Sequence, residues 1–272
     1  MKLLISTDIE GVAGVYSPEQ TRMGNGEYER ARRLMTQEAN AAIAGAFDAG
    51  AEAVFVNDSH GDFRNLIAEQ LDPRAQAVQG KPRRLGMMAG VDLGVDAVAL
   101  VGYHAKAKAA GILAHTINSF AFARIAINGV EYGEAGLYGA LAGEFGVPVA
   151  FASGDDVFIA ETRPLFPSAT FVQTKTASGN GSGVSLAPEA ACAAIRAGMV
   201  QALRAVPARP ELTLAAPLAV RLQTQTPALA DLFSLWPTLE REAPDVIAFE
   251  TASVQDAVRT LNALSAMSAV LR

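Results

Sequence analysis

The chain has 272 residues, with 22 Lys and Arg against 28 Asp and Glu, so its formal net charge is −6. Half of its residues are apolar and 18% are charged, which excludes an intrinsically disordered chain. The acidic balance disfavours a nucleic-acid-binding protein, because such proteins neutralise phosphates with Lys and Arg. The single cysteine, Cys192, excludes an internal disulfide and a zinc site built from cysteines.

Signals for targeting or membrane insertion are not recognisable in the sequence. The apolar run after Met1 is short and ends at Asp8, which does not fit a signal peptide. No stretch approaches the roughly 18 uninterrupted apolar residues of a membrane-spanning helix. We therefore expect a cytoplasmic protein that needs no membrane partner.

Short β-rich runs alternate with longer Ala-rich runs along most of the chain. This alternation predicts an α/β fold with a mostly parallel sheet flanked by helices. The strands are predicted at residues 3–6, 53–56, 97–101, 147–153 and 171–174, and the helices at 27–48, 134–145 and 188–206, with a short helix opening after Gly154. Residues 125–128 with Gly129 predict a hairpin or an edge strand, and the Gly-rich stretch 178–183 predicts a flexible surface loop.

Two prolines, Pro207 and Pro210, mark the best candidate for a domain boundary. We expect a metal-binding catalytic core over residues 1–206 and a smaller C-terminal α+β lobe over 211–272. That lobe would contain strands at 212–220 and 246–249 and a last helix at 254–267. The alternative is that these strands complete the sheet of one single domain.

Two carboxylates follow the first predicted strand. Asp8 and Glu10 are two residues apart, so in an extended chain they point to the same side. Open α/β sheets bind ligands beyond the carboxyl ends of their strands, which is where this pair falls. An isolated Asp-x-Glu is common, and a strand end that simply enters a polar loop explains it equally well.

Two of the three histidines of the chain, His60 and His104, directly follow the second and third predicted strands. With Asp8 and Glu10 they would converge on one edge of the sheet. Such mixed carboxylate and imidazole ligands suit zinc, manganese or cobalt better than magnesium or calcium.

Glu134 and His115 complete the candidate residues. Glu134 begins a predicted helix between two glycines, Gly133 and Gly136, which allow a close approach of the backbone. A favourable acidic residue at a helix N-terminus is the simpler explanation for Glu134 alone. His115 falls in a predicted loop, where it is a candidate ligand, a candidate acid or base, or a surface residue.

Taken together, these motifs resemble the D-aminopeptidase family of zinc peptidases, peptidase family M55. The match runs in order through residues 1–160, while the C-terminal third is matched only loosely. It is carried by Ser6-x-Asp8-x-Glu10-Gly11, Asn57-Asp58-Ser59-His60-Gly61, Arg64-Asn65-Leu66, Leu85-Gly86-Met87-Met88, Val101-Gly102-Tyr103-His104, Leu113-Ala114-His115-Thr116, Gly133-Glu134-Ala135-Gly136, Val147-Pro148-Val149 and Gly154-Asp155-Asp156.

The resemblance implies a site with two Zn²⁺ per chain. Asp8 would bridge the metals, Glu10 and His60 would complete one, and His104 and Glu134 the other. His115 would be the catalytic residue. The implied activity is an aminopeptidase that removes N-terminal, D-configured amino acids from short peptides or amides through a metal-activated water. The implied assembly is a homo-oligomer, a decameric ring.

Two positions depart from the family pattern. Tyr138 stands where a smaller polar residue such as Asn is usual, and residues 177–184 are Gly- and Ser-rich where the family has an Arg-containing turn. Both departures concern substrate contacts rather than the expected ligands. Two other functions were weighed: a metal-dependent 3′–5′ exonuclease, which also opens with a strand carrying Asp-x-Glu, and a non-catalytic scaffold or binding protein.

Overall fold

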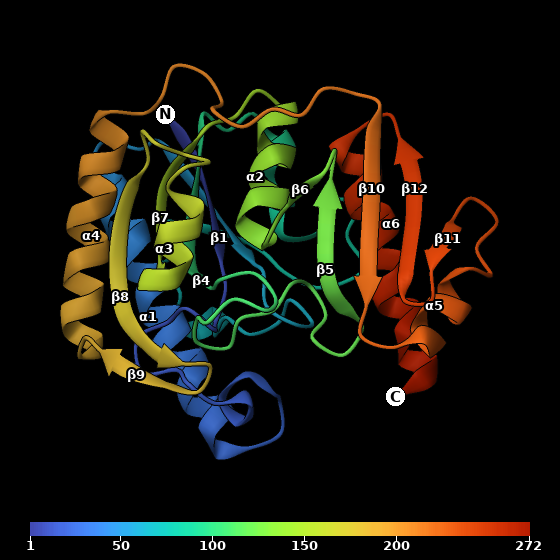
Figure 1. Cartoon of the computed structure of the whole chain (residues 1–272). Helices are drawn as coiled ribbons and strands as arrows, with labels where there is room; N and C mark the ends of the chain where they lie inside the picture. The colour runs from blue at the N-terminus through green and yellow to red at the C-terminus, as the bar shows by residue number, and fades with distance from the viewer.

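The computed structural model describes residues 1–272, which form two β-sheets with helices between and outside them (Figure 1). The first sheet has seven strands in the order β3-β2-β1-β4-β7-β8-β9. All of its pairs are parallel except β8 with β9. Its strands are β1 (Lys2–Thr7), β2 (Ala53–Asp58), β3 (Gln76–Val78), β4 (Ala97–Tyr103), β7 (Val149–Asp155), β8 (Thr170–Gly179) and β9 (Ser182–Ser185).

The second sheet is antiparallel and has five strands in the order β11-β12-β10-β5-β6. Its strands are β5 (Phe122–Ile127), β6 (Val130–Glu131), β10 (Leu218–Thr224), β11 (Glu240–Ala243) and β12 (Val246–Thr251). The expected hairpin at Gly129 joins β5 to the edge strand β6. The predicted α/β class with a mostly parallel sheet is therefore confirmed.

Six α-helices accompany the sheets. They are α1 (Gly26–Asp48), α2 (Glu134–Glu144), α3 (Asp156–Thr162), α4 (Pro188–Arg204), α5 (Pro227–Phe233) and α6 (Val254–Met267). The shorter 3₁₀ helices are η1 (Pro18–Thr21), η2 (Ala68–Gln70), η3 (Gly86–Met88), η4 (Val91–Leu93) and η5 (Ser268–Leu271). The long helix α1 begins after Asn25, whose side-chain oxygen accepts a hydrogen bond from Tyr28 N at 2.9 Å.

Both faces of the parallel sheet are covered, so consecutive side chains of β1 pack in two different hydrophobic cores. Leu3 and Ile5 pack in a core with α1 and α4, whereas Leu4 packs in the core that contains α2, α6 and the second sheet. This explains why its strands are apolar at consecutive positions. Figure 1 shows α2 between the two sheets, with α1 and α4 beyond the first sheet.

The chain crosses between the sheets three times, after β4, after β6 and after β9. The strands β5 and β6 belong to the second sheet although they precede α2, β7 and β8 in the chain. The expected division into a core over 1–206 and a lobe over 211–272 stays a prediction, and β5 and β6 join the second sheet from before that boundary. No helix is both long enough and apolar enough to cross a membrane.

The Gly-rich stretch 178–183 is not the flexible loop that we expected. It forms the end of β8, the start of β9 and the tight turn between them, and Ala177 pairs with Gly183 across the hairpin. A Cβ atom at Gly183 would lie 2.2 Å from the carbonyl oxygen of Thr176. The glycine is therefore needed for a close approach of two strands, a role that composition alone does not distinguish from flexibility.

Replacing Gly183 by Ala is expected to lower the free energy of unfolding by about 1–3 kcal/mol, because the two strands must move apart. Gly181→Ala is the matched control, since the nearest atom to its added Cβ is 3.8 Å away. Thermal unfolding of both variants measures the difference. Equal melting temperatures for the two variants would contradict the packing argument.

Candidate metal centre

The predicted ligands that follow three adjacent strands lie at one edge of the parallel sheet. Asp8 and Glu10 follow β1, His60 follows β2, and His104 directly follows β4. The order β2-β1-β4 places β1 between the two strands that precede the histidines. Glu134 reaches the same place from the first residue of α2.

Asp8 lies between two imidazole rings. Its Oδ1 is 3.2 Å from His60 Nδ1, and its Oδ2 is 3.3 Å from His104 Nε2. Glu10 Oε2 is 3.1 Å from His60 Nδ1, and Glu134 Oε2 is 3.4 Å from His104 Nε2. The five side chains therefore form two groups that share Asp8.

Both histidine rings are oriented by backbone carbonyls. His60 Nε2 donates a hydrogen bond to Thr21 O at 2.8 Å, and His104 Nδ1 donates one to Ala105 O at 3.0 Å. A carbonyl oxygen only accepts, so these nitrogens carry the protons. In the neutral rings, the remaining nitrogens present lone pairs to the carboxylates, which is the arrangement of metal-ligating histidines.

Three buried atoms in this group have no hydrogen-bond partner: Asp8 Oδ2, Glu10 Oε2 and His104 Nε2. An unsatisfied buried polar atom costs about 1–3 kcal/mol, and more when it is charged. A divalent cation between the carboxylates and imidazoles would satisfy all three. The nitrogen and oxygen donor set fits zinc.

The pKa values reflect the same crowding of negative charge. Burial would lower the pKa of His60 and of His104, yet Glu10 and Glu134, respectively, raise these pKa values well above their usual range. Burial and the neighbouring Glu10 raise the pKa of Asp8. A field that holds extra protons on buried imidazoles also favours a bound cation.

His115 stacks on His104, with ring centres 4.1 Å apart and ring planes 10° apart. Its Nδ1 donates to Leu113 O at 3.0 Å, and its Nε2 is 3.7 Å from Glu134 Oε1. His115 keeps 21% of its side chain exposed and lines a cleft, whereas His104 is buried. The geometry allows His115 to be a further ligand or a group that reaches a bound molecule.

Glycines permit the tight backbone at this edge. A Cβ at Gly11 would lie 1.9 Å from Tyr103 O, and Gly11 N donates to Gly102 O at 2.8 Å. Gly102 has a φ of 70°, a region that favours glycine. These contacts bring the segment after β1 against the end of β4, and so bring Glu10 close to His104.

Two positioning residues were not found from the sequence. Lys175 on β8 is buried, and its Nζ donates to Glu10 O at 2.5 Å and to Val15 O at 2.7 Å. Glu38 on α1 is also buried, and its Oε1 accepts from Ala13 N at 2.8 Å. Both side chains therefore fix the segment that carries Glu10. Their types usually lie on the surface, so no sequence pattern marked them.

A third carboxylate holds the segment that carries His115. Asp155 is buried; its Oδ2 accepts from Ile112 N at 2.7 Å and its Oδ1 from Phe158 N at 2.7 Å. Leu113 N donates to Asn180 O in the β8–β9 hairpin at 2.8 Å. The motif residue Asp155 thus acts through the backbone rather than as a ligand.

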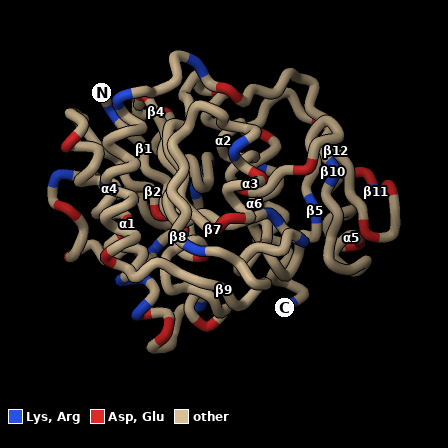
Figure 2. The backbone as a smooth tube through the Cα atoms, turned by 60° about the vertical axis from the view of Figure 1, so that its left-hand side comes forward, with Lys and Arg blue, Asp and Glu red and all other residues tan.

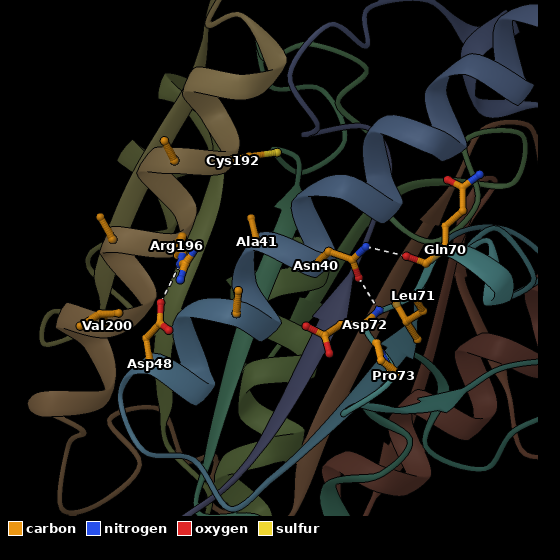
Figure 3. Close-up of a pocket in the computed structure, with 13 residues that line it drawn as sticks. Asn40, Ala41, Asp48, Gln70, Leu71, Asp72, Pro73, Cys192, Arg196 and Val200 are labelled. Atoms are coloured by element: carbon orange, nitrogen blue, oxygen red, sulfur yellow. Dashed lines mark hydrogen bonds and ion pairs between the residues drawn. The ribbon is translucent and has the colours of Figure 1, made fainter.

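A cleft of about 1400 Å³ opens over the metal centre and is lined by Asp8, Glu10, His60, His115 and Glu134 among others. Tyr138, one of the two departures from the family pattern, also lines it and lies 3.3 Å from Asn262 Oδ1 through its hydroxyl. A second groove lies between α1 and α4 on the outer face of the molecule (Figure 3). That groove contains Cys192, whose thiol pKa burial raises to about 11, and none of the candidate ligands.

Glu38 gives a pH-dependent prediction. Burial raises its pKa from 4.5 to about 7, so between these values the folded state holds a proton that the unfolded state has released. Stability therefore falls as pH rises through this window. Glu38→Gln keeps an oxygen that accepts from Ala13 N, but it has no proton to lose. From pH 5 to pH 8, the free energy of unfolding of the variant is therefore expected to rise by about 2 kcal/mol relative to that of the wild type. Urea unfolding at both pH values tests this, and a pH-independent difference would contradict it.

Comparison with known proteins agrees with this geometry. A D-aminopeptidase from Bacillus subtilis (strain 168) is 37% identical over 190 residues, which are 69% of this chain and 68% of the relative. The solved structure of the Zn-dependent D-aminopeptidase DppA from Bacillus subtilis, described as a self-compartmentalizing protease, superposes with a TM-score of 0.95 at 28% identity. The superposition covers 99% of this chain and 98% of the DppA chain. The family model of D-aminopeptidases matches residues 1–263, which confirms the resemblance: the chain belongs to the D-aminopeptidase family, peptidase family M55.

Proposed function

We propose that the protein is a dizinc aminopeptidase that hydrolyses N-terminal D-amino acids from short peptides. The observation that carries the proposal is Asp8, which lies within 3.3 Å of a ring nitrogen of both His60 and His104. One carboxylate shared by two ligand groups is the arrangement expected of a two-metal site. The DppA relative is zinc-dependent, which supports the choice of metal.

In this proposal Asp8 would be the ligand shared by two zinc ions, Glu10 and His60 would complete one, and His104 and Glu134 would complete the other. When bound, the zinc ions supply a water of lowered pKa as the nucleophile and polarise the scissile carbonyl. The backbone carbonyls of Thr21 and Ala105 fix the tautomer of the neutral rings, so that His60 Nδ1 and His104 Nε2 are the nitrogens that would ligate the metal. A carboxylate of the centre can also hold the free amine of the substrate, which would restrict cleavage to the chain end.

His115 is the proposed catalytic residue. Its Nδ1 is held by Leu113 O, so Nε2 is the nitrogen of this partly exposed side chain that remains for a molecule in the cleft. From there it would stabilise the oxyanion of the tetrahedral intermediate or protonate the leaving amine. Stacking against His104 fixes the plane of its ring.

We also propose that the protein assembles into a homo-oligomer, because the DppA relative is a self-compartmentalizing protease. A decameric ring and a cytoplasmic location stay predictions. Of the alternatives, the exonuclease would hold magnesium with carboxylates alone, whereas two histidines here face the shared Asp8. A non-catalytic scaffold would bind no zinc at this centre.

Asp8→Ala and His115→Ala separate the two proposed roles. Asp8→Ala is expected to lose both zinc ions, because both ligand groups lose their shared member. His115→Ala is expected to keep about two zinc ions per chain and to lose at least about 100-fold in kcat, the usual contribution of a general acid or base. Metal content by mass spectrometry and kcat give the readouts. Glu69→Ala is the control, because Glu69 is an exposed carboxylate of η2 that does not line the cleft. Retention of both ions by Asp8→Ala would disprove the bridging role, and loss of zinc from His115→Ala would make His115 a ligand.

Hydrolysis of D-Ala-Gly and L-Ala-Gly, with zinc and after chelation, tests the activity itself. Chelator-sensitive cleavage of the D-form alone is the expected result. Cleavage of the L-form alone would keep the metallo-aminopeptidase and reject the D-preference. No cleavage of either peptide by the zinc-loaded protein would overturn the proposed activity.

A further inference from the structure

The cleft over the metal centre contains more positive charge than the rest of the molecule would suggest. The chain is acidic overall, with a net charge of −6, and Figure 2 shows basic and acidic residues distributed along the whole fold. Apart from the three carboxylates of the metal centre, the cleft is lined by only two acidic residues, Asp62 and Asp256. Six basic residues line it: Arg22, Lys81, Arg83, Arg84, Arg259 and Arg272.

Three of these basic residues, Arg84, Arg259 and Arg272, contact other side chains of the chain. Arg84 pairs with Asp92 at 3.1 Å, and Arg259 pairs with Asp256 at 3.0 Å. Arg272 lies over the ring of Phe120, 5.2 Å from its centre. Two of these three cations are therefore paired with carboxylates, and the third lies against an aromatic ring.

The three remaining cations gather around the segment that carries His60. Arg22 directly follows Thr21, whose carbonyl accepts the hydrogen bond of His60, and it has no ion-pair partner. Lys81 Nζ lies 5.2 Å from the ring centre of Phe63 and 3.4 Å from Asp62 Oδ1. Asp62 is shared, because its Oδ2 also lies 3.5 Å from Arg64.

Arg83 is the most enclosed of the three. Its guanidinium stacks 3.8 Å from the ring centre of Phe63 and donates to Asn57 Oδ1 at 2.6 Å and to Asp58 O at 2.7 Å. None of these acceptors is a carboxylate, and its buried Nε has no hydrogen-bond partner. Burial lowers the pKa of this guanidinium from 12.5 to about 10. The Asp58 carboxylate raises this pKa in part but forms no direct ion pair with Arg83. A desolvated cation without a direct ion pair is stabilised by an anion placed beside it.

We propose that Arg22, Lys81 and Arg83 form a carboxylate-binding subsite at the His60 end of the cleft, which selects short peptides with a free C-terminal carboxylate. The inference rests on the proposed aminopeptidase function and names the substrate class of that site. Arginine and lysine are the side chains that bind carboxylates, through charge-assisted hydrogen bonds. Because the subsite and the metal centre line one cleft, the carboxylate and the N-terminal residue of one substrate must both fit in it, which favours short peptides.

The test compares D-Ala-Gly with its C-terminal amide, D-Ala-Gly-NH₂, which differs only in the charge of the end group. We expect kcat/KM to be at least about 10-fold higher for the free acid, mainly through a lower KM, because the subsite binds a part of the substrate that does not react. Arg22→Gln and Lys81→Gln are exposed substitutions that should bring this ratio towards one. Arg22→Glu should reverse the preference.

Arg30→Gln is the matched control, because Arg30 is exposed on α1 and does not line the cleft. It should leave the ratio at its wild-type value. Zinc content is measured for every variant, so that loss of metal is not mistaken for loss of the subsite.

The outcomes separate the subsite from the activity. Equal kcat/KM for the acid and the amide in the wild type, or a ratio that Arg22→Gln and Lys81→Gln leave unchanged, would overturn the subsite and leave the aminopeptidase intact. Hydrolysis of neither peptide by the zinc-loaded wild type would overturn the aminopeptidase function, and the subsite with it.

Discussion

The concentration of buried negative charge at one edge of the parallel sheet is the constraint on which the site depends. Asp8, Glu10 and Glu134 are each almost fully buried and lie around two imidazoles. Carboxylates removed from water repel one another and lose hydration, so this arrangement is stable only with compensating positive charge. Protons on the histidines supply part of that charge, and a pair of divalent cations would supply all of it.

Buried groups outside the centre hold its segments in place. Lys175 and Glu38 reach the segment after β1 from β8 and from α1, and Asp155 reaches the segment before His115 from the end of β7. Each of them bonds to backbone atoms rather than to the ligands. Ligand positions set by backbone anchors on rigid elements do not depend on the rotamers of flexible surface side chains.

The sequence predicts the parts of the site that follow from strand order. Asp8, Glu10, His60 and His104 each follow a buried apolar strand, and the carboxyl ends of parallel strands meet at one edge of a sheet. The position of Glu134 depends instead on α2 packing between the two sheets, a long-range arrangement that only the family resemblance implied. Lys175 was not recognised at all, because its burial is decided by the backbone carbonyls it contacts, and these are distant in sequence.

The difference between local sequence patterns and long-range contacts also explains which elements of the fold were predicted wrongly. Long apolar or amphipathic runs predict elements well: the last helix has the expected bounds, Val254–Met267. The hairpin β8–β9 was read as a loop because glycine is used both for flexibility and for close packing, and only the neighbouring Thr176 carbonyl decides between them. The short strand β11 and the helix α5 carry too few residues to give a periodic signal.

The pairing of β5 with β10 has a consequence for the history of the chain. These strands are neighbours in the second sheet, yet the segment between them contains α2, β7, β8 and α4, and therefore most of one side of the first sheet. Neither sheet can be exchanged, duplicated or lost as a contiguous piece of gene without removing part of the other. The two sheets are expected to be inherited as one unit, and recombination that brings new modules to this protein is confined to its ends and surface loops.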